Sequence, residues 1–403
     1  MLTTKSQIKI KTSVLQDAVS KAVKGAGNLP ILAITTAIGI EVTPQGSLIL
    51  TTTSNTVNLK ITVPNVTSPQ EVGFYACTEC DLFAKLTSKT TSEFVTLILT
   101  DSALVFVGNG QYTLPIIADE EGSVVRIQDI VVNSDSNYEI TKKDIDKILR
   151  YNKGSVAKTY ETPVYAGYCI QSSDKHEKSI AVTYNTNTAC ISNIAWKGSD
   201  LLLPRVIVDL MSLISSEKAT YACDGVNIII KGGDVEISGA VQEGLESYPV
   251  DSLAQLVNSN EFTSFVKISK PVLSSIIDRM SLFVTDIEMN SINIGISAEG
   301  MTVSSHNMAG CEQVQLMEKD IKEPMTKIVV LNDLKTVVDT LVGDTVTIKF
   351  GSDKGLNILE NNVNQLVPFI SDEEESDESI DEEIEDEYVD DSSDTDSVPF
   401  DEE

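Results

Sequence analysis

The sequence has few aromatic residues and no long hydrophobic run. Aromatic side chains make up 5% of the 403 residues, and Trp196 is the single tryptophan. Platforms that stack single-stranded nucleic acid need clustered aromatic and basic side chains, so this scarcity argues against that mode of binding. No stretch approaches the ~20 apolar residues that span a membrane, and the first residues, MLTTKSQIKIKTS, lack an apolar signal segment. We therefore expect a cytoplasmic protein with no membrane partner.

Side chains suited to catalysis are also scarce. The chain has two histidines, His176 and His306, each in a polar stretch without an acidic or nucleophilic partner at a recognisable spacing. The glycines of VGNGQ and KGGD do not open a helix after a strand, as a phosphate-binding loop would, and are typical of hairpin turns. We expect no enzymatic activity and no cofactor.

The six cysteines do not form a metal-binding pattern. Cys77 and Cys80 make a CxxC pair, but no second pair or nearby histidine completes a zinc site. Most of the others lie in strand-like runs such as TACISN and TYACDG. This usage predicts small, buried, reduced thiols and no metal.

Positive charge is absent from the end of the chain. Residues 372–403 hold 19 acidic residues and no Lys or Arg, so 11 of the 30 net negative charges belong to the preceding 371 residues. Such a segment cannot bury enough apolar surface to offset its ordering entropy, and we predict a disordered tail. It could improve solubility, mimic DNA at a basic surface, or dock through SVPF (397–400), which resembles LVPF (366–369).

The rest of the chain repeats. Amphipathic helices are predicted over 13–24, 141–153 and 270–284, starting about 128 residues apart, and each precedes three alternating strands. A second helix follows in each copy, over 78–90, 205–215 and 331–342, and leads into a hairpin. We therefore predict an α+β protein of three similar domains, each with two helices and about eight strands. The predicted boundaries are 1–133, 134–260 and 261–371, followed by the tail at 372–403.

This ordered triplicate resembles the DNA sliding clamps, specifically the beta subunit of bacterial DNA polymerase III. The junction NLPIL after the first helix and the chain end QLVPFI add to the resemblance, which covers residues 1 to about 370. The family implies a homodimeric ring whose helices line a pore around duplex DNA. It implies a processivity factor that tethers a polymerase and is opened by a clamp loader. The family ends near residue 370, so the tail would mark a viral or otherwise specialised member.

The helices allow this resemblance to be tested, because a pore-lining helix buries one face and presents cations on the other. The predicted buried faces include Leu15 and Val19 on the first helix, and Leu82, Phe83 and Leu86 on the helix over 78–90. The predicted pore-facing cations are Lys21, Lys24, Lys85, Lys89, Lys143, Lys147, Arg150, Lys153, Arg205, Arg279 and Lys335. Long basic side chains can contact phosphates in any register, which suits sliding without sequence specificity.

The resemblance also implies a hydrophobic groove between the second and third domains that binds a short peptide from polymerases and loaders. The groove residues carried over are Thr183, Asn185, Tyr248, Leu366, Val367, Pro368 and Phe369. Tyr184, Asn185, Thr186 and Asn187 replace the charged residues usual in the family. We expect the recognised peptide to differ accordingly.

A non-enzymatic structural or adhesion protein of repeated β-rich domains is the alternative. It predicts no pore and indifference to DNA topology. The lysine-bearing helix at the head of each copy argues against it.

Overall fold

The computed structural model describes residues 6–27, 33–66, 73–158, 162–172, 178–284, 290–305, 309–351 and 353–370. Pro30 and the rest of NLPIL, both histidines and the acidic tail lie outside these residues. The elements all belong to one compact unit, Met1–Phe369. Among the described residues, no helix is both long and apolar enough to cross a membrane.

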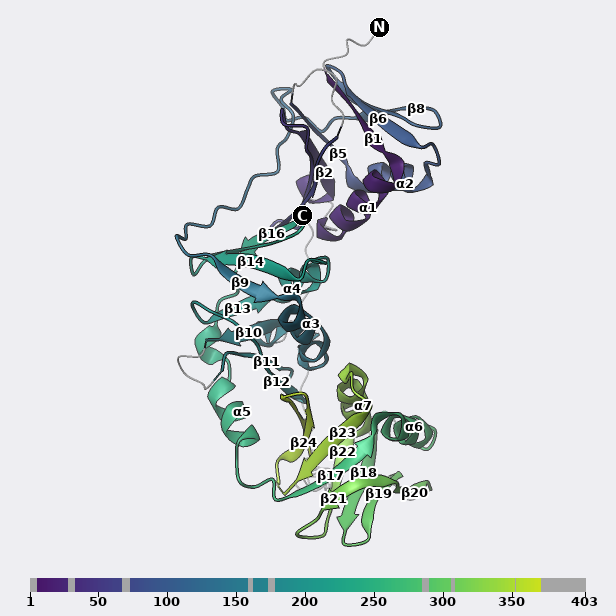
Figure 1. The fold of residues 1–403 in the computed structure, drawn as a ribbon, viewed down its shortest axis with the longest axis vertical. Coiled ribbons are helices and arrows are strands. Elements are labelled where there is room, and N and C mark those ends of the chain that lie inside the picture. Colours follow the sequence, from purple (N-terminus) through teal and green to yellow (C-terminus); the bar gives the residue numbers. More distant parts are fainter. Residues whose placement is uncertain are drawn as a thin grey trace, which may run out of the picture. The chain divides into compact units, whose positions relative to one another are not determined.

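The first repeat runs strand, helix, four strands, helix, three strands (Figure 1). Its elements are β1 (Ser6–Lys11), α1 (Thr12–Ala22), β2 (Ala37–Val42), β3 (Leu48–Thr53), β4 (Val57–Val63), β5 (Phe74–Glu79), α2 (Cys80–Lys89), β6 (Phe94–Leu99), β7 (Ala103–Val107) and β8 (Gln111–Pro115).

The second repeat has the same order and ends in an additional helix, α5 (Val250–Val257). Its elements are β9 (Tyr138–Thr141), α3 (Lys142–Arg150), the 3-10 turn η3 (Asn152–Ser155), β10 (Gly167–Gln171), β11 (Ile180–Tyr184), β12 (Ala189–Asn193), β13 (Leu201–Pro204), α4 (Arg205–Met211), β14 (Lys218–Cys223), β15 (Asn227–Gly232) and β16 (Val235–Ala240).

The third repeat differs by one extra strand, β21, before its second helix. Its elements are β17 (Ser264–Ser269), α6 (Lys270–Met280), β18 (Ser291–Ser297), β19 (Gly300–Ser305), β20 (Cys311–Val314), β21 (Leu316–Asp320), β22 (Met325–Val330), α7 (Leu331–Thr340), β23 (Thr345–Phe350), β24 (Gly355–Glu360) and β25 (Val363–Pro368). Among the described residues, the predicted two helices and about eight strands are confirmed for the first and third copies, whereas the second copy has eight strands and a third helix, α5.

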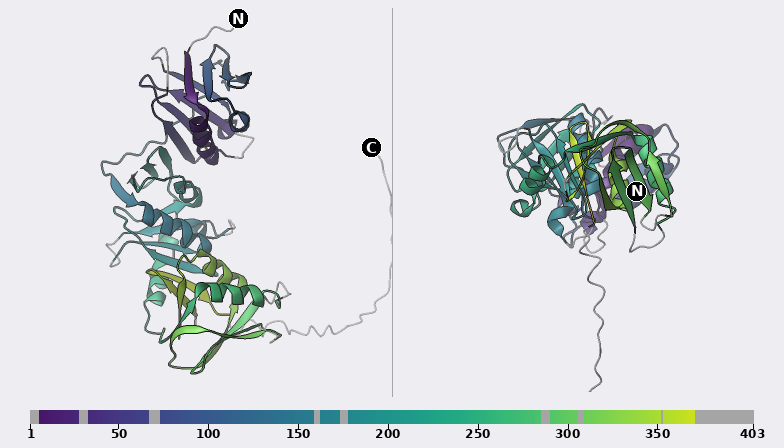
Figure 2. Two further views of the ribbon diagram at one scale, coloured as in Figure 1. Left: turned by 45° about the vertical axis from the view of Figure 1, so that its right-hand side comes forward. Right: turned by 90° about the horizontal axis from the view of Figure 1, so that it is seen from below.

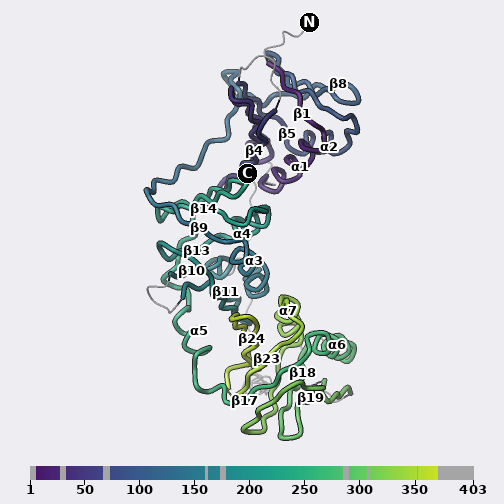
Figure 3. The backbone as a smooth tube through the Cα atoms, in the orientation of Figure 1, coloured from purple at the N-terminus to yellow at the C-terminus, as the bar shows by residue number. Residues whose placement is uncertain are grey.

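Neighbouring repeats are joined through continuous antiparallel sheets. β4 of the first repeat pairs with β16 of the second, giving the eight-stranded sheet β5-β2-β3-β4-β16-β15-β14-β9. β12 pairs with β25 in the same way, giving a nine-stranded sheet that runs from the second repeat into the third. Figure 3 shows the yellow-green strand β24 of the third repeat beside the teal strands of the second.

The helices pack on these sheets through the predicted apolar faces. Figures 1 and 2 show the helices lying against the strands of their repeats. On α1, Leu15, Ala18, Val19 and Ala22 are buried, as the helical spacing predicts. The prediction for α2 is partly wrong, because Leu82 is 41% exposed while Phe83 is fully buried. Phe83 packs edge-on against Phe106 of β7, which fixes the rotation of the helix and turns Leu82 outward.

The end of α1 is fixed by its contact with the sheet beneath it. The Thr52 hydroxyl donates to the Ala22 carbonyl at 2.6 Å, satisfying an acceptor that the helix end leaves open. The chain then passes so close to β4 that a Cβ on Gly25 would lie 2.5 Å from the Leu59 Cβ. Packing therefore requires glycine at this position, the last residue of the 3-10 turn η1 (Val23–Gly25) that follows α1.

A buried asparagine organises the second repeat where it meets the third. Asn152 of η3 is fully buried, and its amide nitrogen donates to the carbonyls of Ala181 at 3.0 Å and Cys190 at 3.3 Å. Its amide oxygen accepts from the Ser192 hydroxyl at 2.6 Å. The Thr183 hydroxyl donates to the Asn152 carbonyl at 2.8 Å. One side chain thus joins η3 to β11 and β12.

We predict that Asn152→Ala destabilises the protein by about 2–4 kcal/mol, because it leaves several buried polar groups without partners. Thermal or denaturant unfolding measures the loss. Asn332→Ala on the exposed surface of α7 is the control, with an expected change within about 0.5 kcal/mol. Equal stability of the two variants would contradict a structural role for the Asn152 network.

Candidate DNA and partner interfaces

Six of the eleven predicted pore-facing cations have a carboxylate partner: Lys21, Lys85, Lys147, Arg205, Arg279 and Lys335. Lys85 bonds Asp81 at 2.5 Å and Arg205 lies 3.6 Å from Asp209, each pair one helical turn apart on α2 or α4. Such exposed pairs contribute little to stability, but each cancels a positive charge that a phosphate would otherwise meet.

Lys21 on α1 is held from two elements. Its ammonium lies 2.8 Å from Asp17 one turn earlier and 2.8 Å from Asp234, in the β15–β16 turn of the second repeat. Burial lowers the pKa of Lys21, but the hydrogen bonds to both carboxylates outweigh it and the net shift is upward. Lys21 therefore forms an ion pair that links the first two repeats.

The cations of the third repeat are also paired. Arg279 on α6 donates through two nitrogens to Glu312 of β20, at 2.7 and 2.6 Å, and these bonds hold the pKa of Glu312 below its usual value. Lys335 on α7 bonds Asp278 on α6 at 2.8 Å. Neither residue offers a free positive charge.

The α3–η3 segment is different. Lys147 donates to the Asn193 carbonyl at 2.9 Å, with Asp144 at 3.5 Å. Arg150 donates to the carbonyls of Thr340 and Leu341 at 3.2 and 3.3 Å, so it caps the last turn of α7 from the neighbouring repeat. Lys143 and Lys153 are exposed and form no ion pair with another described residue. The same holds for Lys24 and Lys89 elsewhere in the first repeat.

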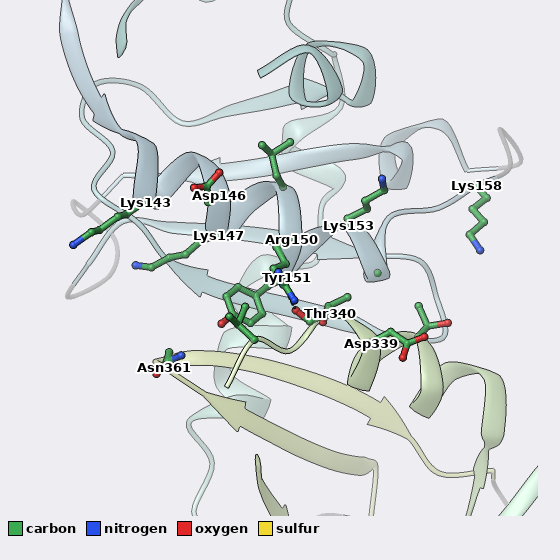
Figure 4. Close-up of a pocket in the computed structure, with 14 residues that line it drawn as sticks. Lys143, Asp146, Lys147, Arg150, Tyr151, Lys153, Lys158, Asp339, Thr340 and Asn361 are labelled. Carbon is green, nitrogen blue, oxygen red and sulfur yellow. Dashed lines mark hydrogen bonds between the residues drawn. The ribbon is translucent and has the colours of Figure 1, made fainter. Parts of the chain in front are cut away.

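A cleft of about 970 Å³ lies between α3–η3 and α7 (Figure 4). Lys143 and Lys147 line one end of it, Lys153 and Lys158 the other, and Arg150 and Tyr151 lie between them. Lys158 was missed in the sequence because it lies outside any predicted helix.

The predicted groove residues divide between two faces of one sheet. Leu366 belongs to an outer apolar cluster with Tyr248, Ile191 and Leu253. Val367, the next residue, is fully buried in the core of the third repeat on the opposite face. Phe369 packs against that same core, so the predicted set is not one continuous surface. Pro368 is half-buried at the end of β25.

Two further groove residues have structural contacts of their own. Thr183 is fully buried in the Asn152 network, so its side chain is not accessible to a peptide. The Asn185 side-chain oxygen accepts from the backbone N–H groups of Thr188 at 2.6 Å and Asn187 at 3.1 Å, closing the β11–β12 turn. Both residues position the strands beside the outer cluster.

Three tyrosines from separate segments meet at this outer cluster. Tyr165 stacks edge-on against Tyr184 at 5.0 Å and against Tyr248 at 5.8 Å between ring centres. Burial raises the pKa of Tyr248 well above its usual value, and its hydroxyl lies near the Tyr184 backbone without a hydrogen bond of normal geometry. Sequence reasoning named Tyr248 and Tyr184 but missed Tyr165, because spacing along the chain does not reveal that three distant tyrosines converge.

The cysteines are mostly buried thiols, as predicted. Burial raises the pKa of Cys77 and of Cys80 to about 11, which makes both thiols unreactive at neutral pH. Cys311 corrects the prediction, because it is exposed at the start of β20, an edge strand. Among the described residues, no group of three or more His, Cys, Asp or Glu side chains could hold a metal ion.

We predict that Tyr248→Phe raises the free energy of unfolding by about 1 kcal/mol, because a buried unpaired hydroxyl is costly. Tyr221→Phe is the matched control: its hydroxyl accepts from the Lys197 N–H and donates to the Lys197 carbonyl, both at 2.8 Å. That variant should lose about 1–2 kcal/mol. Thermal unfolding of both variants checks the order, and the reverse order would show that the Tyr248 hydroxyl is bonded.

Comparison with solved structures gives matches of one fold. No protein-family model and no curated protein sequence matches the chain. The solved structure of a DNA polymerase sliding clamp from Bacillus subtilis is similar, with a TM-score of 0.78 and 13% identity over 91% of this chain and 99% of that one. DNA polymerase III subunit beta from Borrelia burgdorferi matches with a TM-score of 0.77, 16% identity and coverage of 91% and 100%.

The Helicobacter pylori beta clamp bound to a DNA ligase peptide matches with a TM-score of 0.76 and 16% identity, over 91% of this chain and 100% of that one. Each match spans nearly the whole length of the solved structure and all three repeats described above. The chain has the fold of the bacterial DNA polymerase III beta-subunit sliding clamps.

Proposed function

We propose that the chain is a DNA polymerase processivity factor, a sliding clamp that encircles duplex DNA without sequence specificity and has no catalytic activity of its own. The observation that carries the proposal is the strand pairing at the two repeat junctions. In each junction, the third strand after a repeat's first helix pairs with the last strand of the next repeat. We place the domain boundaries at 1–133, 134–260 and 261–371.

This pairing pattern leaves two strands without a partner from another repeat. One is the third strand after the first helix of the third repeat, and the other is the last strand of the first repeat. β20 is the third strand after α6 and pairs only with β19, while β8 is the last strand of the first repeat and pairs only with β7, among the described residues. β20 of one copy and β8 of another therefore complete a third junction. Such a head-to-tail contact forms a closed ring when the rotation closes.

The register of this third junction follows from the other two. In the third repeat, pairing runs across the sheet from Phe265 to Leu366, through Lys349 and Asn357. In the first repeat, the equivalent path starts at Gln7, also five residues before its helix, and reaches Thr113. Thr113 is thus the counterpart of Leu366.

The opposite strand is placed in the same way. Ala189 begins β12 and forms the last pair of its hairpin with Tyr184. Cys311 begins β20 and forms the last pair of its hairpin with Ser304. Since Ala189 pairs with Leu366, Cys311 of one copy should lie opposite Thr113 of the other.

Exposed apolar side chains lie beside both open edges. Tyr112 on β8 is 44% exposed, and Leu282 and Phe283, which follow α6, are 73% and 41% exposed. Phe283 lies against Gly310, immediately before β20. Burying these side chains between copies would stabilise the pairing. With three repeats per chain, two copies give the six-domain ring that the fold implies.

We predict that Thr113→Cys forms an intermolecular disulfide with the native Cys311 on mild oxidation, because directly opposite residues of antiparallel strands lie within disulfide reach. Non-reducing electrophoresis detects the product as a cross-linked dimer. Gln111→Cys is the control, since it lies on the same face two positions away and should cross-link far less. Equal cross-linking of both variants, or none, would contradict the proposed junction.

We also predict that the assembled protein stays bound to nicked circular DNA during gel filtration. It can be placed on the DNA by a loader, or by oxidising the Thr113→Cys variant in the presence of the DNA so that the ring closes around it. Cutting the circle should release it, because a ring held by topology slides off a free end. If the protein stays bound after the circle is cut, it binds DNA by direct contact and not by encircling it. If it is never retained, the result would favour a structural repeat protein indifferent to DNA topology.

The outer tyrosine cluster with Leu366 supports a peptide-binding role at the boundary of the second and third repeats. The Helicobacter pylori clamp is bound to a ligase peptide, and we propose that polymerase and clamp-loader peptides use this cluster here. The proposed setting is the bacterial cytoplasm, or the host cytoplasm if the chain is viral.

A further inference from the structure

The first strand of the third repeat is covered at an edge that is open in the described part of the first repeat. β17 pairs with β23 on one side and with β21 on the other (Figure 1). β1 pairs with β6 alone among the described residues. Ser6 pairs with the last residue of β6, and Ser264 pairs with the last residue of β23, each six residues before its helix begins. The two strands therefore correspond residue by residue, and β21 shows how a further strand lies on such an edge.

The backbone of β1 directs every second residue to this open edge. The Thr12 N–H donates to the Glu93 carbonyl at 3.0 Å, so the ladder to β6 uses Thr12 and every second residue before it. The residues between them, Gln7, Lys9 and Lys11, turn their N–H and C=O groups to the open edge. An extended segment can therefore add there as a further strand through backbone hydrogen bonds.

The first repeat has no described counterpart of β21. β21 lies between β20 and β22, and the segment at the same place in the first repeat follows β4 and precedes β5. Of its described residues, Val66 donates its N–H to the Gly46 carbonyl at 2.8 Å, and a Cβ on Gly73 would lie 2.8 Å from the Val42 carbonyl oxygen. Both contacts are with the β2–β3 hairpin, which belongs to the other sheet of this repeat.

The side chains at the open edge favour an acidic strand. On β21, Glu318 lies directly opposite Lys267, with its carboxylate 4.0 Å from the ammonium. Lys9 is the counterpart of Lys267, since both stand three residues before the helix. Lys9 and Lys11 are exposed and form no ion pair with another described residue, and the Lys9 ammonium lies over the Phe94 ring at 4.5 Å. β1 therefore has the cation of this cross-strand pair without its carboxylate.

β9, the strand at the same place in the second repeat, has different chemistry. Glu139 stands where β1 has Lys9, and Lys218 of β14 holds it at 2.8 Å. A Cβ on Gly198 would lie 2.8 Å from the Tyr138 ring, so the connection between β12 and β13 packs against the start of β9. An acidic strand is therefore matched by β1 and not by β9.

We propose that the open edge of β1 binds an extended acidic segment of a partner protein as an additional antiparallel strand. The segment places a carboxylate opposite Lys9, as Glu318 lies opposite Lys267, and an apolar residue opposite Ile10, as Leu316 lies opposite Ile268. Pairing of two β1 strands would bring the lysines of both copies together, which disfavours a second copy as the occupant.

This site is separate from the interfaces proposed above. β8, through which the ring closes, lies at the opposite edge of the same four-stranded sheet. The outer tyrosine cluster belongs to the second and third repeats. A partner on β1 therefore leaves both the copy-to-copy junction and the tyrosine cluster free, and its binding does not depend on the ring.

The test measures binding of a fluorescently labelled synthetic peptide, QLMEKDIKE (residues 315–323), to the full-length protein by fluorescence anisotropy. Lys9→Glu should weaken binding about tenfold, because it places like charges opposite each other. A peptide carrying Glu318→Lys should bind this variant better than it binds the wild type, a reversal that structural damage cannot produce. Circular dichroism confirms that the variants are folded.

A second variant tests the backbone contribution. Gln7→Pro removes an N–H that points to the open edge and leaves the ladder to β6 intact, so it should weaken binding of the same peptide without unfolding the protein. Unchanged affinity in this folded variant would contradict strand addition.

Lys24→Glu is the matched control, since Lys24 is an exposed lysine of the same repeat outside β1. It should change the affinity by less than about twofold. Equal losses from Lys9→Glu and Lys24→Glu, or no binding to the wild type, would overturn the proposal and leave the clamp function untouched. A chain ending at residue 371 should bind the peptide as the full chain does. A large gain in affinity would mean that the acidic tail is the occupant and would overturn the assignment to a partner.

Discussion

The structure depends on one repeated interaction, the backbone pairing of two edge strands from different repeats. β4 with β16 and β12 with β25 each satisfy a row of N–H and C=O groups that would otherwise face solvent or another chain. These pairings turn three separate α+β units into continuous sheets with the helices packed on them. Among the described residues, β8 and β20 are each left with one open edge, and the proposed ring uses the same interaction to join copies.

The charges bear on the proposed clamp function, since a protein that slides on DNA must hold it without anchoring. Each tightly neutralised phosphate adds affinity and salt dependence. Here several helix cations are engaged by Asp or Glu, and Lys21 and Arg150 connect neighbouring repeats. Of the predicted cations, Lys24, Lys89, Lys143 and Lys153 remain exposed without a described carboxylate partner. A mildly acidic body with a local basic cleft is compatible with non-specific, reversible contact, because fields act over about 10 Å.

The repeat, the helix faces and the fold could be predicted from the sequence because periodicity records burial directly. Leu82 shows the limit: it has the right spacing, but the Phe83–Phe106 contact sets the rotation of α2. The Lys85–Asp81 pair was recognisable from its spacing, whereas Asp234 lies far along the chain from Lys21 and only the fold brings them together. The same holds for the tyrosine cluster and for Lys158. Val367 and Leu366 were grouped by sequence, yet neighbouring strand residues face opposite sides of the sheet.

The most direct test of the account is the mass of the full-length chain in solution at micromolar concentration, by native mass spectrometry or light scattering. Closure by the β8–β20 junction predicts a discrete dimer at twice the 43.7 kDa chain mass, with no larger species as concentration rises. An open-ended series of oligomers would show that the junction forms but does not close. The ring would be contradicted if the chain stays strictly monomeric in the presence of duplex DNA and if the Thr113→Cys variant also stays monomeric after oxidation.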